Sequence, residues 1–161
     1  MSDVYIQINN KKFIAFIKAL KLNIPHVEVG ILGDTDARNM ANKGDRSNAS
    51  IGIHHEYGAP EHNLVQRSFL RMPLNVHFGK DLEKSGLFDK EVLKKVIADQ
   101  SITQWVYVMA RCAEATVGTA FDSGGYGLWK TWKDPKYKNN TGKLLQDSTQ
   151  LRDSITSRVV V

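Results

Sequence analysis

The chain has 161 residues, of which 42% are hydrophobic and 24% are charged, with 12 glycines and 4 prolines. This composition is typical of a folded globular protein and excludes a collagen-like, repeat or disordered chain. The length matches one typical domain, so we expect a single domain over residues 1–161. No apolar run is long enough to span a bilayer and the N-terminus lacks the pattern of a signal peptide, so we expect a soluble protein.

Positive charge is concentrated near one end of the chain. Twenty-two Lys and Arg residues against 17 Asp and Glu residues give a formal net charge of +5. Much of the excess lies between Trp129 and Lys143, where five lysines accompany one aspartate. Such a segment favours contact with nucleic acid or an acidic protein surface, although many solvated surfaces are equally basic. The single cysteine, Cys112, excludes an internal disulfide.

The N-terminal third is predicted to begin as strand, helix and strand. Apolar residues recur at every second position over 4–8, which is the period of a strand with one buried face. Helical spacing of apolar residues follows over 11–21, and the strand period returns over 27–31. The polar residues 33–49 then predict a long loop, and such loops are commonly functional or mobile.

The next segment is predicted to contain a short helix followed by partly extended chain. Residues 49–57 fit about two helical turns, with Ser47 or Asn48 as the N-cap. We expect 64–74 to be partly extended, because Pro73 interrupts helical hydrogen bonding.

Two further helices are predicted in the second half of the chain. Residues 90–98 place apolar side chains at helical spacing. Ser101 and Gln104 then form a capping-box pattern at the start of another helix, which we expect to be the longest and to stop at Gly124.

The C-terminal part is predicted to hold a second long loop over 122–143, a helical turn over 148–152 and a closing strand over 155–161. Together these elements predict an α+β fold. We expect a small mixed or antiparallel sheet packed against two or three helices, with long loops near 33–49 and 122–143.

Residues capable of catalysis are present, but their spacing argues against a reaction centre. His54, His55 and Glu56 are consecutive, and neighbours on a helix point about 100° apart, so they cannot converge on one ion. The chain has no HExxH or GxSxG motif, and the glycines over 124–127 lack the residues of a phosphate-binding loop. Cys112 is interpreted as a core residue. We predict no catalytic residue, no metal, no cofactor and no enzymatic activity.

Two tryptophans lie in the basic segment. Trp129 and Trp132 alternate with lysines, a pattern that can stack on nucleic-acid bases. Tryptophan also has a large apolar area and is a strong anchor in interfaces and cores. We interpret the pair as anchors that fix the long loop to the body of the protein or to a neighbouring subunit.

Two groups of motifs resemble the small neck proteins of tailed bacteriophages. The first comprises VEVGI at 27–31, ASIGIHHEYG at 49–58 and QRSFLR at 66–71. The second is carried by a spaced set of residues near the C-terminus: Leu128, Trp129, Thr131, Lys143, Leu144, Leu145, Asp147, Ser148, Leu151, Ser154 and Ile155. The resemblance covers roughly residues 27–71 and 105–158. Gln66 stands where that group usually has proline, and Thr149 stands where it commonly has glycine.

The resemblance implies a structural protein of the virion neck. Such a protein is a tail-completion or head-tail connector subunit that forms a homo-oligomeric ring, a hexamer or dodecamer, between the capsid portal and the tail. Its partners would be neighbouring neck, portal-adaptor or tail-tube proteins, with passing contact with genomic DNA and none with a membrane. It would be located in the virion neck or tail after assembly in the host cytoplasm.

The motifs of the resemblance are structural, so their residues are expected to hold the fold or the subunit interface. Glu56 is expected to pair with Arg67 or Arg71, and Tyr57 to pack with Phe69, so that the short helix and the following segment form one rigid unit. The candidate subunit-interface or fold-defining residues are Glu56, Tyr57, Arg67, Phe69, Arg71, Trp129 and Trp132.

Two other functions stay open from the sequence. The first is a DNA-binding accessory protein that uses the basic segment 129–143. The second is a hydrolase acting on cell wall or nucleic acid, although the chain shows none of the nucleophile motifs considered above.

Overall fold

The computed structural model describes residues 25–33, 46–99, 102–130 and 149–160, with Lys11, Ile14, Ala15, Ile17, Lys18, Leu144 and Leu145. Five predictions lie wholly or mostly outside the described residues: the strand 4–8, the helix 11–21, the loops 33–49 and 122–143, and Trp132.

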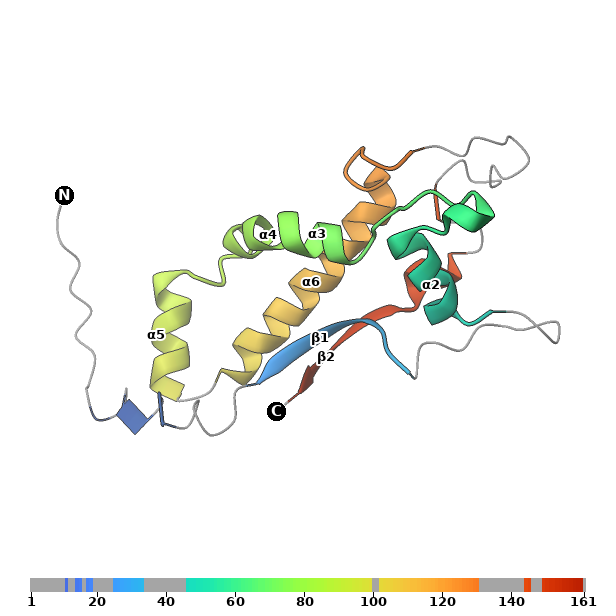
Figure 1. The fold of residues 1–161 in the computed structure, drawn as a ribbon. Helices are drawn as coiled ribbons and strands as arrows, with labels where there is room; N and C mark the ends of the chain where they lie inside the picture. Colours follow the sequence, from blue (N-terminus) through green and yellow to red (C-terminus); the bar gives the residue numbers. More distant parts are fainter. Residues whose placement is uncertain are drawn as a thin grey trace.

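The described elements form an α+β fold, as predicted (Figure 1). In chain order they are β1 (His26–Ile31), α2 (Asn48–Tyr57), η1 (Pro60–His62), α3 (Arg71–Val76), α4 (Phe78–Lys84), α5 (Lys90–Asp99), α6 (Thr103–Ser123), α7 (Gln150–Asp153) and β2 (Ile155–Val160). Among the described residues, no helix is both long and apolar enough to cross a bilayer.

The two strands confirm the predictions for 27–31 and 155–161 and pair with each other. They are antiparallel, and their register runs from His26 opposite Val160 to Ile31 opposite Ile155. A two-stranded sheet is marginally stable in water by itself. It is stabilised here because it packs against α6, so the first and last described elements of the chain are held together on one long helix.

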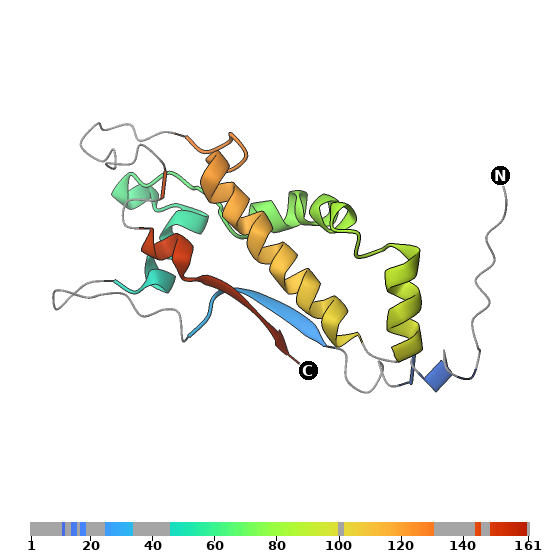
Figure 2. The same ribbon diagram turned by 180° about the vertical axis from the view of Figure 1, so that it is seen from behind.

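Helix α6 is the structural centre of the molecule. It contacts β1 and β2 as well as α3 and α4, and it runs between these two groups of elements (Figures 1 and 2). Its 21 residues confirm the longest predicted helix, which ends at Gly124 with a left-handed φ of 64°. The predicted capping box is wrong: the helix starts at Thr103 with Ile102 as N-cap, which places Gln104 one residue too early in the first turn for the box geometry.

The prediction that Pro73 interrupts helical hydrogen bonding within 64–74 is also wrong. Residues 65–70 lie outside any helix or strand, but α3 begins at Arg71 and passes through Pro73. Proline is tolerated there because it stands in the first helical turn, where its missing N–H would have had no partner inside the helix. Its carbonyl still accepts a hydrogen bond of 2.8 Å from the His77 N–H.

The core forms where distant parts of the sequence meet around the C-terminal half of α6. Its buried residues are Phe69, Val117, Ala120, Phe121, Trp129, Leu145 and Leu151. Phe121 is central, because its ring centroid lies 5.2 Å from that of Phe69 and 5.8 Å from that of Trp129. Aromatic contacts at this spacing add to the stabilisation from burial itself.

Candidate functional site

Helix α2 has clear start and stop signals. Ser47 is the N-cap, and its Oγ accepts a hydrogen bond of 3.2 Å from the Ser50 N–H. The helix ends at Gly58, whose φ is 79°. A Cβ added at Gly58 would lie 3.0 Å from the Gln66 backbone nitrogen, so glycine also permits the chain to return close to the end of α2.

Glu56 binds the chain that follows this return. The residue is 6% exposed, and its carboxylate accepts hydrogen bonds from the Ser68 hydroxyl at 2.5 Å and from the N–H groups of Phe69, Leu70 and Arg71 at 2.9, 3.0 and 3.2 Å. The last of these donors opens α3, whose first N–H groups have no partner inside the helix. A side chain of α2 therefore caps α3. We call Glu56 and residues 68–71 the Glu56 bracket.

The pairing predicted for Glu56 is with Arg71 rather than Arg67. The Nε of Arg71 lies 3.6 Å from the Glu56 Oε1. Arg67 is 1% exposed and donates instead to the backbone carbonyls of Lys130, at 3.0 Å, and Val65, at 3.4 Å. It thus ties the bracket to the chain that follows α6. Burial lowers the pKa of the Arg67 guanidinium.

Tyr57 and Phe69, which are predicted to pack together, differ strongly in burial in the structure. Tyr57 is 61% exposed, and the Arg71 guanidinium carbon lies 5.0 Å from the centre of its ring, a cation–π distance. Phe69 is buried and packs against Phe121. The two residues therefore have different roles, one on the surface and one in the core.

The neighbouring histidines do not form a metal site with Glu56. His54 Nδ1 lies 2.6 Å from the Ser50 carbonyl oxygen. The pKa of His55 is lowered to about 4, first by burial and then by the charges of Arg67 and His54. In the part of the chain that the structure describes, no three His, Cys, Asp or Glu residues are placed to hold a metal ion.

Trp129 fixes the turn after α6 to the body of the protein. It is 9% exposed, and its indole N–H donates to the Ser68 carbonyl at 3.3 Å. Its ring lies directly over Gly125, where a Cβ would overlap the indole. The interpretation of Trp129 as an anchor is confirmed for the body of its own chain, which makes it fold-defining. Trp132 lies outside the described residues.

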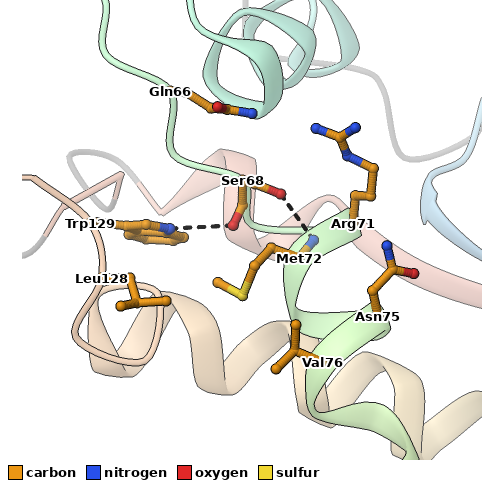
Figure 3. Close-up of a pocket in the computed structure, with 8 residues that line it drawn as sticks. All are labelled: Gln66, Ser68, Arg71, Met72, Asn75, Val76, Leu128 and Trp129. Carbon is orange, nitrogen blue, oxygen red and sulfur yellow. Dashed lines mark hydrogen bonds between the residues drawn. The ribbon is translucent and has the colours of Figure 1, made fainter.

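Two hollows flank the Glu56 bracket. One, the Trp129 groove, has a volume of about 440 Å³ (Figure 3). It is lined by Gln66, Ser68, Arg71, Met72, Asn75, Val76, Leu128 and Trp129. Leu128 and Val76 are 70% and 57% exposed. The groove therefore presents apolar surface to solvent beside the bracket.

The second hollow, the α2 groove, has a volume of about 310 Å³ and is lined in part by Glu56 itself. It is lined by Ile31, Ala49, Gly52, Ile53, Glu56, Tyr57, Phe69 and Leu70. Ile53 and Tyr57 are about 60% exposed. Exposed apolar side chains gathered in one area are typical of surfaces that bind other proteins.

Two important residues had no signal in the sequence. Ser68 donates its hydroxyl hydrogen to Glu56 and accepts a hydrogen bond of 3.0 Å from the Met72 N–H. Glu114 of α6 reaches Ser157 of β2, 43 positions further along the chain. Neither contact follows from local periodicity, because both depend on how distant segments meet in the fold.

The basic segment is described only at its beginning. Lys130 is exposed, and its carbonyl accepts the bond from Arg67. The remaining lysines of the segment lie outside the described residues.

The comparisons with other proteins identify no relative. The chain matches no protein-family model, no curated protein and no solved structure.

Proposed function

We propose that this chain is a structural subunit of a tailed-bacteriophage neck, a tail-completion or head-tail connector protein that forms a ring between the capsid portal and the tail. The observation that carries the proposal is the convergence of both groups of resembling motifs on one core. Phe69 of the first group and Trp129 of the second pack on the same residue, Phe121. Glu56 and Arg67 then fasten these motifs by hydrogen bonds to backbone groups.

The backbone at Thr149 gives separate support. Proteins of the resembling group commonly have glycine at this position, and Thr149 has a φ of 57°, in the left-handed region that favours glycine. Threonine is β-branched and is strained there. The backbone geometry of this turn therefore suits the residue that the resemblance expects, although the chain itself carries threonine.

The polar contacts of Glu56 and Arg67 are structural. Glu56 is saturated by four donors and an arginine, and Arg67 is held by carbonyls. These groups are fully engaged in holding backbone, which suits a rigid assembly unit. The exposed apolar rims of the two grooves, at Ile53, Tyr57 and Leu128, provide area for contacts between subunits.

The proposal is tested by measuring mass and binding. Size-exclusion chromatography with light scattering gives the mass of the purified chain, alone and after mixing with tails or capsids of the cognate phage. We expect the chain to bind one of these particles and to form a ring there. A chain that binds neither particle would contradict the proposal.

The DNA-binding alternative makes a different prediction for the same preparation. It expects the free chain to bind duplex DNA with an affinity that falls steeply as salt rises. It also expects that affinity to be lost when Lys130, Lys133, Lys136 and Lys138 are all replaced by Gln. The neck proposal expects that lysine variant to bind tails or capsids as the unchanged chain does.

A further inference from the structure

One edge of the two-stranded sheet is occupied at its middle by a side chain. The Glu114 Oε1 accepts hydrogen bonds from the Ser157 N–H at 2.6 Å and from the Ser157 hydroxyl at 2.7 Å. Because a strand N–H points either at its partner strand or away from it, the Ser157 N–H points away from β1. The carboxylate therefore lies at the outer edge of β2. Its other oxygen pairs with Arg111 at 3.2 Å, so the carboxylate is itself held in place.

The other edge, on β1, is open among the residues that the structure describes. Val29 is directly opposite Ser157, so its own N–H and C=O also point away from the partner strand. The alternation of an antiparallel ladder gives the same direction to Val27 and Ile31. Among the described residues, no hydrogen bond outside the β1–β2 ladder reaches the backbone of these three residues. The sequence of β1 also lacks the lysine or proline that commonly protects an exposed edge.

The α2 groove continues this edge. Ile31, the last residue of β1, lines the groove together with Ile53 and Tyr57, which are both about 60% exposed. When an extended segment adds to a sheet edge, its backbone bonds supply affinity and a neighbouring pocket receives one of its side chains. Both parts of such a site are present here and are contiguous.

We propose that the open edge of β1 and the α2 groove bind residues 4–8 of a second copy of this chain, as an added strand. Val4, Ile6 and Ile8 stand at every second position, which predicts a strand with one apolar face. Such a strand requires a partner, and of the two described sheet edges Glu114 already occupies the middle of one. The inference rests on the proposed function for its choice of a second copy, because a closed ring joins two different surfaces of neighbouring subunits.

A matched pair of proline variants tests the edge. Val27 and Val159 face each other in the register, and both N–H groups point outward, so neither Val27→Pro nor Val159→Pro removes a bond between β1 and β2. Sedimentation over a range of concentrations should show self-association of the unchanged chain, weakened about tenfold or more by Val27→Pro and unchanged by Val159→Pro. Equal association of the two variants, or an unchanged chain that stays monomeric at all concentrations, would overturn the proposal.

If Val27→Pro fails to fold, hydrogen exchange in the unchanged chain tests the same contact. In the unchanged chain, exchange of the Val27, Val29 and Ile31 amides should slow as association increases, while the Val159 amide should not change. Exchange at β1 that is independent of concentration would overturn the proposal.

A spin label distinguishes a second copy from the chain's own N-terminus. Two kinds of Cys112→Ser chain are mixed. The first has natural-abundance nitrogen and carries a nitroxide at Gln7→Cys, and the second is ¹⁵N-labelled and carries no nitroxide. We expect broadening of the β1 amide signals of the ¹⁵N-labelled chains. Broadening only when label and ¹⁵N are in the same chain would show pairing within one chain and would overturn the proposal.

Failure of this inference can be distinguished from failure of the proposed neck function. Rings that join heads to tails with Val27→Pro as well as with the unchanged chain would remove this inference and leave the neck function standing. Self-association through β1 in a chain that never joins heads to tails would remove the neck function and leave this inference standing.

Discussion

The two ends of the molecule are built in opposite ways. At one end, around α2, the Glu56 bracket fastens backbone to a buried carboxylate, and Phe69 and Trp129 complete the core around Phe121 (Figure 1). At the other end, α5 (Lys90–Asp99) has no buried residue and has an exposed ion pair between Lys94 and Glu91. Stability should therefore be concentrated at the bracket, while the α5 end tolerates change.

The largest expected difference in stability between the two ends comes from removing one carboxylate from each. Glu56→Ala leaves the N–H groups of Phe69, Leu70 and Arg71 without their acceptor, and we expect a loss of about 4 kcal/mol in the free energy of unfolding. Glu91→Ala removes only an exposed pair and should leave the melting temperature unchanged. Thermal unfolding followed by circular dichroism measures both, and equal melting temperatures would contradict the comparison.

A second pair of variants probes how tightly Trp129 closes the core. In Gly125→Ala the new Cβ overlaps the indole at a backbone φ of 69°, and we expect a loss of about 3 kcal/mol. Gly127 has a φ of 80° but open space around it, so Gly127→Ala should cost only about 1 kcal/mol of backbone strain. Denaturant unfolding gives both values. Similar losses in the two variants would show that Trp129 does not pack against Gly125.

The bracket end should also be the source of a pH dependence. The pKa of His55 is about 4 in the folded chain and 6.5 ordinarily, so the unfolded chain binds the extra proton between these values and stability falls as the pH is lowered. This amounts to about 2 kcal/mol between about pH 7.5 and pH 5. Unfolding at both pH values should show that loss reduced in His55→Gln and retained in His54→Gln. An unchanged slope in His55→Gln would contradict the assignment.

The smallest effect is expected at α5. Val92→Ala changes a residue that is 38% exposed and should alter stability by less than about 0.5 kcal/mol. The same substitution at Val117, which is 0% exposed in α6, should cost about 2 kcal/mol. Denaturant unfolding of the two variants compares the ends directly. A loss at Val92 as large as that at Val117 would mean that α5 belongs to the core.

Much of the fold could be predicted from the sequence where one local rule decides the structure. The strand period at 27–31, the Ser47 cap and the glycine stop at Gly124 each depend on a few neighbouring residues, and each is confirmed. The prediction at Pro73 is wrong because the effect of a proline depends on which turn of the helix it occupies. That position is set by Glu56, which caps α3 from another helix.

The sequence predicts which residues make up the candidate site, but it predicts only some of the contacts between them. The acid–base pairing of Glu56 was expected, and Arg71 was one of the two partners considered. Arg67 was assigned the same role because charge alone cannot show that a guanidinium will bind carbonyls from Val65 and Lys130. Tyr57 and Phe69 are both aromatic and near in sequence, yet only the tertiary fold decides which of them is buried.

The central proposal, that this chain completes the neck of a phage, is tested most directly by counting joined particles. Electron microscopy would compare lysates of the cognate phage in which the gene for this chain is interrupted, with and without the purified chain added. We expect separate heads and tails without the chain and joined particles with it, but no joining with Glu56→Ala at a temperature where that variant is unfolded. Normal joining in the interrupted phage without any added chain would contradict the proposal.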